Sequence, residues 1–259
     1  MQLASLGSGS RGNATVVRSG ETCLLVDLGF GVRETVKRLE TLQLQPEHIN
    51  ACLVTHEHSD HIAGVAAFAG RFNIPVYATA GTRTVWESKQ SLNALSIHTV
   101  TIKREFSLGG IKVTPVPVPH DAREPVQYVF DDGSVNLGIL TDLGMVTPIV
   151  RQAYRGCSAL LIEANHDSNM LRNGKYPRSL KQRVSGNWGH LNNNQTANFV
   201  GEICDAKAIS HLIVGHISQQ NNTPDLVANA MEEVTSRIPH VFYASQDSCL
   251  DWISLNKQT

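Results

Sequence analysis

Four side chains that can bind a metal ion lie within residues 56–61, whose sequence is HEHSDH. Their imidazole nitrogens and carboxylate oxygens together suit zinc, manganese or iron. The block directly follows the apolar run 51–54, which is typical of a buried strand, and precedes the apolar segment 62–68, which predicts a helix. A solvated, histidine-rich turn is the alternative, but it does not explain why four side chains that can bind a metal ion lie within six residues. We therefore expect a metal site at the end of a strand.

Further histidines and an aspartate stand where predicted strands or apolar runs end: His120, Asp142, His190 and His216. A single histidine at a strand end is more often a hydrogen-bonded structural residue than a metal ligand. Four such positions, taken together with the 56–61 block, favour the opposite interpretation, because imidazole and carboxylate groups together form metal sites.

Short strands and helices must position these residues. Strands are predicted at residues 3–6, 15–18, 23–27, 51–55, 75–78, 110–118, 126–130, 134–140, 159–162 and 212–214. Helices are predicted at residues 32–42, 62–72, 82–90, 193–204 and 224–238. Asp131-Asp132-Gly133 is typical of a hairpin turn, and Pro115 and Pro117 predict that their strand ends early or lies at a sheet edge. The alternation in two similar halves predicts an α/β fold of two packed sheets with helices outside, as one domain over residues 1–259.

The composition is that of a globular protein, with 41% hydrophobic and 17% charged residues, so the chain can bury a sizeable core. No apolar run approaches the ~18 residues that a bilayer span needs, and the N-terminus lacks the basic start and apolar stretch of a signal peptide. The five cysteines are widely spaced and odd in number. We therefore expect reduced thiols and a cytoplasmic location.

The formal net charge of −1 argues against a protein that coats nucleic acid through bulk charge. The balance is uneven, however, because residues 170–186 carry five cations and no acid: Arg172, Lys175, Arg178, Lys181 and Arg183. One interpretation is a solvated basic loop. The other is a contact with a phosphate backbone.

The HxHxDH block, followed in order by His, Asp and His, resembles the binuclear hydrolases of the metallo-β-lactamase superfamily along nearly the whole chain. The resemblance implies an αββα sandwich of two mixed sheets and two divalent metal ions, Mn²⁺, Zn²⁺ or Fe²⁺. It implies that one ion is held by three histidines, His56, His58 and His120. It implies that the other is held by Asp60, His61 and His216. Asp142 would bridge them, and because β-lactamases often carry cysteine at that place, this aspartate argues against lactamase activity.

The segment Leu161–Asp167, with the later Gly189-His190-Leu191, looks like the Glu and His pair of the transfer-RNA 3′-processing nucleases. That resemblance implies that Glu163 orients His190, which protonates the leaving oxygen, with Asp60 as a further catalytic group. A positioned proton donor contributes roughly 10²–10⁴ in rate. His166 either contacts a phosphate or caps the following turn. Asp27 is either a hydrogen-bond acceptor for a metal-bound histidine or a simple turn residue.

The Gly/Ser-rich segment 7–15 offers backbone N–H groups and the side chains of Ser8, Ser10 and Asn13 to an anion. A tight hairpin is the alternative. This start is similar to those of the YycJ (WalJ) exonucleases and the PhnP-like cyclic phosphodiesterases. Together with EANHD, GHL and the segment 214–224, it makes the chain most like the YycJ family, whose members are 5′-to-3′ DNA exonucleases. The segment between Asp142 and His190 is too short for an inserted β-CASP domain.

The resemblance therefore implies a phosphodiesterase that degrades DNA from a 5′-phosphorylated end, with a metal-bridging hydroxide as nucleophile. Arg178, Lys181 and Arg183 would hold the nucleic-acid backbone. The near-neutral charge favours an alternative, a PhnP-like phosphodiesterase for a small cyclic ribose phosphate. A thioesterase of the glyoxalase II type leaves Glu163 and His190 without a role. A non-enzymatic binding module on a degenerate hydrolase fold usually loses metal ligands, and here every expected ligand is present.

Overall fold

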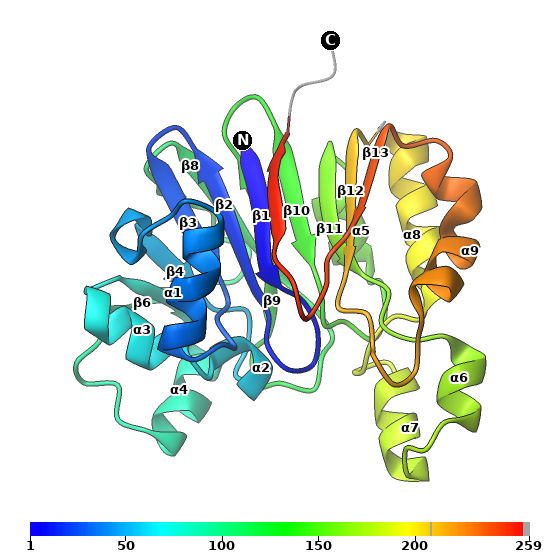
Figure 1. Ribbon diagram of the computed structural model, residues 1–259, viewed down its shortest axis with the longest axis horizontal. Coiled ribbons are helices and arrows are strands. Elements are labelled where there is room, and N and C mark those ends of the chain that lie inside the picture. The colour runs from blue at the N-terminus through cyan, green and yellow to red at the C-terminus, as the bar shows by residue number, and fades with distance from the viewer. Residues whose placement is uncertain (208, 256–259) are drawn as a thin grey trace.

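The computed structural model describes residues 1–207 and 209–255, whose strands form two seven-stranded sheets (Figure 1). The first sheet has the order β14-β1-β2-β3-β4-β5-β6 and the second β13-β12-β11-β10-β9-β8-β7. The strands of the first sheet are β1 (Gln2–Gly7), β2 (Ala14–Ser19), β3 (Thr22–Val26), β4 (Ala51–Leu53), β5 (Val76–Thr79), β6 (Ile97–Val100) and β14 (Leu250–Ser254). Those of the second are β7 (Phe106–Leu108), β8 (Ile111–Pro117), β9 (Val126–Asp131), β10 (Asn136–Leu140), β11 (Ala159–Glu163), β12 (His211–Gly215) and β13 (His240–Tyr243).

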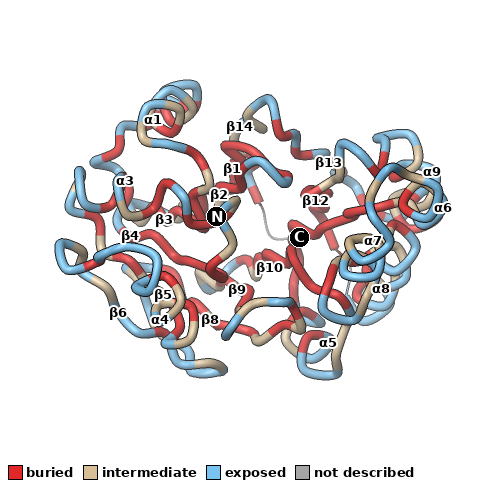
Figure 2. Tube along the Cα trace, turned by 90° about the horizontal axis from the view of Figure 1, so that it is seen from below, coloured by how far each residue is buried: buried red, intermediate tan, exposed pale blue. Residues whose placement is uncertain are grey.

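Helices cover the outer face of each sheet. The first sheet carries α1 (Val32–Thr41), the 3₁₀ helix η1 (Pro46–His48), α3 (Val65–Phe72) and α4 (Ala80–Lys89). The second carries α5 (Pro148–Tyr154), α8 (Asn193–Ala206) and α9 (Pro224–Thr235). Figure 2 shows buried residues concentrated in the two sheets, with exposed helical turns outside them. The predicted αββα sandwich is confirmed. In the described part of the chain, no helix is long and apolar enough to span a membrane.

The central strands of the two sheets are buried on both faces, and their successive side chains point to opposite sides. In β3, Cys23 and Leu25 pack toward the helices of the first sheet, whereas Leu24 and Val26 pack between the two sheets. The same alternation in β11 places Leu160 against the outer helices. Both faces of a strand therefore need apolar residues, which explains why the predicted strands are short continuous apolar runs.

Strand direction brings the predicted functional residues to one end of the sandwich. β3 and β4 are parallel, as are β10, β11 and β12, and β8 runs with β10 because each is antiparallel to β9. The carboxyl ends of these strands lie at the lower end in Figure 1, beside α2 (Ser59–Ile62), α6 (Ser168–Asn173) and α7 (Arg178–Ser185). Asp27 and His216 directly follow such strands, Glu163 is the last residue of β11, and Asp142 lies two residues after the end of β10.

The expected helix at residues 62–72 is divided. α2 begins earlier, at Ser59, and α3 begins only at Val65. The break is at Gly64, where an added Cβ would lie 1.8 Å from the carbonyl oxygen of Phe30. The backbone N–H of Gly64 donates to the carbonyl of Leu28 at 2.9 Å. Close packing on the 28–30 loop therefore interrupts the helix, and it seats the metal-binding block on that loop.

The proline-containing strand shows one of its two predicted outcomes, and the basic segment contains more helix than a loop would. β8 continues through Pro115 to Pro117, paired with β9 on one side, while β7 covers just Ile111–Val113 on the other. The prolines thus lie at a sheet edge, as one of the two predicted outcomes required. The basic segment 170–186 is not a plain loop but contains α6 and α7. That residues 1–259 form one domain without a β-CASP insertion stays a prediction.

Candidate metal centre

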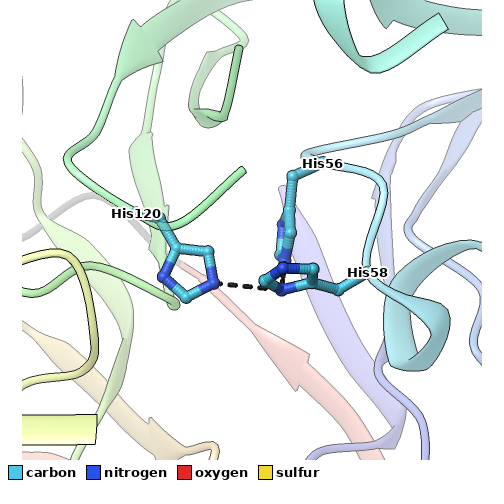
Figure 3. Close-up of side chains that lie close together, drawn as sticks. All are labelled: His56, His58 and His120. Atoms are coloured by element: carbon cyan, nitrogen blue, oxygen red, sulfur yellow. Dashed lines mark hydrogen bonds between the residues drawn. The ribbon is translucent and has the colours of Figure 1, made fainter. Parts of the chain in front are cut away.

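Three histidine nitrogens converge at the lower end of the sandwich (Figure 3). Nδ1 of His58 lies 3.1 Å from Nε2 of His56 and 3.2 Å from Nε2 of His120. Ligand nitrogens about 2.0–2.1 Å from a tetrahedral metal ion are themselves about 3.3 Å apart. The observed spacing therefore fits three imidazoles arranged around one cation. His56 and His120 are almost fully buried, which keeps their rings in place.

Backbone carbonyl groups accept a hydrogen bond from one nitrogen of His58 and of His120. These bonds determine which nitrogen of each ring can bind a metal ion. Nε2 of His58 donates to the backbone carbonyl of Asp121 at 3.2 Å. Nδ1 of His120 donates to the carbonyl of Gly189 at 3.0 Å. In a neutral imidazole the other nitrogen then carries a lone pair, and here that nitrogen faces the centre.

Asp27 orients His61 directly and His56 through Thr55. Its carboxylate accepts from the backbone N–H of Thr55, from the Thr55 hydroxyl and from Nδ1 of His61, at 2.8, 2.8 and 2.7 Å. The Thr55 hydroxyl in turn lies 2.9 Å from Nδ1 of His56 and accepts a hydrogen bond from it. Asp27 is therefore more than a turn residue, because it orients two histidines of the HxHxDH block.

A second group of candidate ligands surrounds Asp142. Nε2 of His61 lies 3.4 Å from Oδ2 of Asp60 and 3.3 Å from Oδ2 of Asp142. Nε2 of His216 lies 3.7 Å from Oδ2 of Asp60 and 3.4 Å from Oδ1 of Asp142. Asp142 also lies within 4.8 Å of ligand atoms of His56. The Asp142 carboxylate thus lies between the two groups of ligands, at the position where a bridging group is expected.

The chemistry of this donor set fits divalent cations. Oδ2 of Asp142 and Nε2 of His216 are buried and have no hydrogen-bond partner among the described residues. Leaving such a group unsatisfied costs about 1–3 kcal/mol, which a bound cation would offset. Asp27, Asp142 and His216 also have positive φ angles of 58°, 53° and 49°. Backbone strain of this kind collects at functional sites.

The charges in the centre leave the histidines of the second group protonated when no cation is bound. Burial alone would lower the pKa of His61, yet Asp142 and two further aspartates raise that pKa well above its usual value. At His216, burial alone would also lower the pKa. The nearby carboxylates, Asp142 first among them, instead raise the pKa to about 9. Burial would raise the pKa of Asp142, but His216 and His61 hold it well below the usual range. A cation that binds here must displace protons.

This proton balance predicts how pH changes the stability of the metal-free protein. The pKa of His216 is about 9 in the folded chain against an ordinary 6.5, so the folded state binds more protons between these values. The contribution of His216 to the unfolding free energy should then have its full value below pH 6.5. It should fall by about 3 kcal/mol as pH rises to 9. Thermal unfolding with a chelator should reveal this decline. With saturating Mn²⁺ the decline should vanish, and an equal decline in both forms would contradict the assignment.

Glu163 and His190 form a fixed pair beside the metal-binding groups. Oε2 of the fully buried Glu163 accepts from Nδ1 of His190 at 2.9 Å. Its other oxygen accepts from the backbone N–H groups of Leu143 and Leu191 at 3.0 and 3.1 Å. The carboxylate cannot rotate without breaking these bonds, so it holds the ring of His190 with Nε2 free.

A cavity of about 310 Å³ joins these features. One wall is formed by residues predicted to bind metal or carry protons: His58, Asp60, His120, Asp142, His190 and His216. Another part of the lining comes from α7 and from Tyr176 just before it. A substrate in this cavity would contact the metal-binding groups and His190 together.

The predicted phosphate-binding residues of the N-terminal loop have two different positions. Ser10 is exposed and lines the cavity. Ser8 is buried, and its hydroxyl accepts from the backbone N–H of His216 at 2.8 Å. The buried amide of Asn13 donates to Oδ2 of Asp60 at 3.2 Å. Ser8 and Asn13 therefore hold metal-centre residues in place, whereas Ser10 faces the cavity.

The other predicted phosphate contacts are also divided. Arg183 lines the cavity and forms an ion pair with Asp121, which raises the pKa of Arg183. Arg178 and Lys181 lie on the same helix but do not line the cavity. His166 is buried away from the cavity wall, and burial lowers its pKa to about 4.

The lining of the cavity includes residues that the sequence did not single out as site residues, among them Asp121, Asn165 and Tyr176. Asp121 directly follows His120, and Asn165 lies inside the EANHD motif, so position along the chain was an available signal. Nδ2 of Asn165 donates to the backbone carbonyl of His216 at 3.2 Å. Tyr176 offered no signal, because it lies in an irregular polar segment.

Comparisons with known proteins agree with this arrangement. Residues 22–217 match the beta-lactamase superfamily domain. The exodeoxyribonuclease YycJ of Bacillus anthracis is 32% identical over 242 residues, which cover 90% of this chain and 89% of that protein. The exodeoxyribonuclease WalJ of Streptococcus pneumoniae is 32% identical over 229 residues, which cover 87% and 85%. The metallo-beta-lactamase fold protein YhfI of Bacillus subtilis shares the fold, with a TM-score of 0.72 and 16% identity over 98% of this chain and 99% of that chain.

Proposed function

This chain belongs to the metallo-β-lactamase superfamily, in the family of the exodeoxyribonucleases YycJ and WalJ, and we propose that it degrades DNA from a 5′-phosphorylated end. The observation that carries the proposal is the Glu163–His190 pair beside the converging metal-binding groups. Such a pair supplies a proton to a leaving oxygen, which an alkoxide leaving group requires. The relatives' names supply the substrate class.

Two divalent ions are the proposed cofactors. His56, His58 and His120 would hold one, Asp60, His61 and His216 the other, and Asp142 would contact both. When bound, such ions lower the pKa of water and neutralise charge on a phosphoryl group. Nitrogen and carboxylate ligands accept Zn²⁺, Mn²⁺ and Fe²⁺ alike.

The remaining steps belong to side chains of the cavity. Oδ2 of Asp60, aligned by Asn13, accepts a hydrogen bond from the attacking water. His190 donates a proton from Nε2 to the leaving oxygen, while Glu163 stabilises the positive charge that the ring carries before the transfer. Ser10 and Arg183 hold phosphate oxygens at the cavity wall.

DNA is favoured over a small cyclic phosphate by the basic segment. The cations of α6 and α7 stand beside the cavity while the whole chain carries a net charge of only −1. A locally positive rim holds a phosphate backbone without general affinity for nucleic acid. Arg178 and Lys181 would contact phosphates beyond the cavity.

The five cysteines are free thiols in the described structure, which supports a reducing compartment, the cytoplasm.

Incubation with Mn²⁺ and 5′-phosphorylated duplex DNA should release nucleotides from the 5′ end. The same DNA with a 5′-hydroxyl should be degraded more slowly, because Ser10 and Arg183 then lose a phosphate partner. End-labelled gels and chromatography of the products measure both rates. Hydrolysis of a cyclic ribose phosphate without nucleotide release from either DNA would instead support the small-molecule phosphodiesterase.

A further inference from the structure

The apolar side of α7 lies outside the three hydrophobic clusters of the described residues. Leu180 and Val184 lie one helical turn apart on this helix, and both line the cavity. Within residues 1–207 and 209–255, neither side chain belongs to the three hydrophobic clusters that stabilise the sheets and outer helices. Tyr176, just before the helix, is also half-buried and lines the cavity.

This arrangement is unusual for a short amphipathic helix. Such a helix normally buries its apolar stripe against the core and turns its charges to water. Here α7 has no fully buried residue among those described, and its stripe lines the same cavity as the candidate metal-binding groups. The apolar wall is therefore left for a ligand to cover.

Resting on the proposed function, we propose that Tyr176, Leu180 and Val184 form a binding wall for the base of the terminal nucleotide. The ligand chemistry is then that of a nucleoside phosphate, with its phosphate toward Ser10 and Arg183 and its base on Tyr176. A flat base has a π-face that stacks on an aromatic ring and an edge that tolerates aliphatic contact. A sugar phosphate without a base would leave the wall exposed to water.

Charge on the same helix supports this occupant over a purely apolar one. Arg183 lines the same cavity as the apolar wall, and it pairs with Asp121, which lies beside His58 and His120. A ligand must therefore present an anion and an apolar plane within one small molecule or chain end. The cavity volume of about 310 Å³ accommodates one nucleotide rather than a folded peptide.

Calorimetry on the metal-loaded protein tests the wall without relying on turnover. Thymidine 5′-monophosphate should bind at least about fivefold more tightly than 2-deoxyribose 5-phosphate, because a stacked base strengthens binding by that factor or more. Tyr176→Ala and Leu180→Ala should bring the two affinities close together while leaving the sugar phosphate unchanged. Tyr176→Phe should keep the preference. Gln182→Ala, on the exposed side of α7, is the matched control and should change neither affinity.

Two outcomes would contradict the proposed base-binding wall. Equal affinity of the native protein for the two ligands would do so, and so would an equal loss of both ligands in Tyr176→Ala, since that indicates a structural role. Neither outcome contradicts metal-dependent DNA cleavage, which is measured separately. Conversely, a base preference without DNA cleavage would retain the wall and remove the exonuclease assignment.

Discussion

Replacing Asp142 with alanine is expected to remove bound metal and to lower DNA hydrolysis by at least about 10³-fold, while the chain still folds. A metal ion contributes several kcal/mol to the stabilisation of a transition state, and each 1.4 kcal/mol is about tenfold in rate. The two oxygens of Asp142 face His61 and His216 separately, so a single substitution weakens both sides of the second group.

The isosteric variant Asp142→Asn separates charge from shape. Asn tolerates the left-handed backbone that Asp142 adopts at φ 53°, so this variant should fold at least as well as the alanine variant. It lacks the negative charge that attracts the cations, and it should therefore also lose metal. Elemental analysis, circular dichroism and the nuclease assay together measure the effect. The exposed Asp205→Asn is a suitable control, and normal metal content with normal rates in Asp142→Ala would refute the assignment.

Glu163→Gln is expected to lower kcat on DNA by roughly 10²–10⁴ with the metal content unchanged. The glutamine carbonyl can still accept from the N–H groups of Leu143 and Leu191, so the local backbone is retained. Its amide, however, cannot stabilise a positive charge on His190. His190→Ala should produce a loss of the same size, and the double variant should add little, because the two residues act as one unit.

Substrates with different leaving groups distinguish proton donation by Glu163 and His190 from a structural role of the pair. A nucleotide p-nitrophenyl ester expels a stable anion that needs no proton, so both variants should hydrolyse it at nearly the native rate. DNA expels an alkoxide and should show the full loss. The ratio of kcat for the two substrates is the measurement. Equal losses on both substrates would indicate that the pair supports the fold or the metals rather than proton transfer.

Local patterns predicted the fold well where apolar periodicity was strong. β3, β11 and β12 begin and end within a residue or two of expectation because both of their faces are buried. The helix break at Gly64 escaped prediction, since it depends on contact with Phe30, which the sequence does not place beside it. The basic segment 170–186 carries no strong apolar period, and its helices were likewise missed.

The site was predictable to the extent that its residues lie at strand ends. The three ligand positions His56, His58 and His61 follow one strand, and their convergence with His120 and Asp142 agrees with the expected grouping. Ser8 and Asn13 were expected to face a phosphate. The structure instead turns them inward, because the buried backbone of His216 and the carboxylate of Asp60 need their hydrogen bonds.

The sequence by itself determined the class of chemistry, because ligand type and short spacing in HEHSDH are local properties of one strand, loop and helix. Only the tertiary structure decided which groups meet. Ser8 reaches His216 across 208 positions, and Asn13 reaches Asp60 across 47. Such contacts depend on how two sheets align their carboxyl ends and on which polar groups burial leaves unsatisfied. The apolar wall of α7 also depends on the tertiary structure. The sequence shows apolar residues on this helix, but only the packed core shows that they line a cavity.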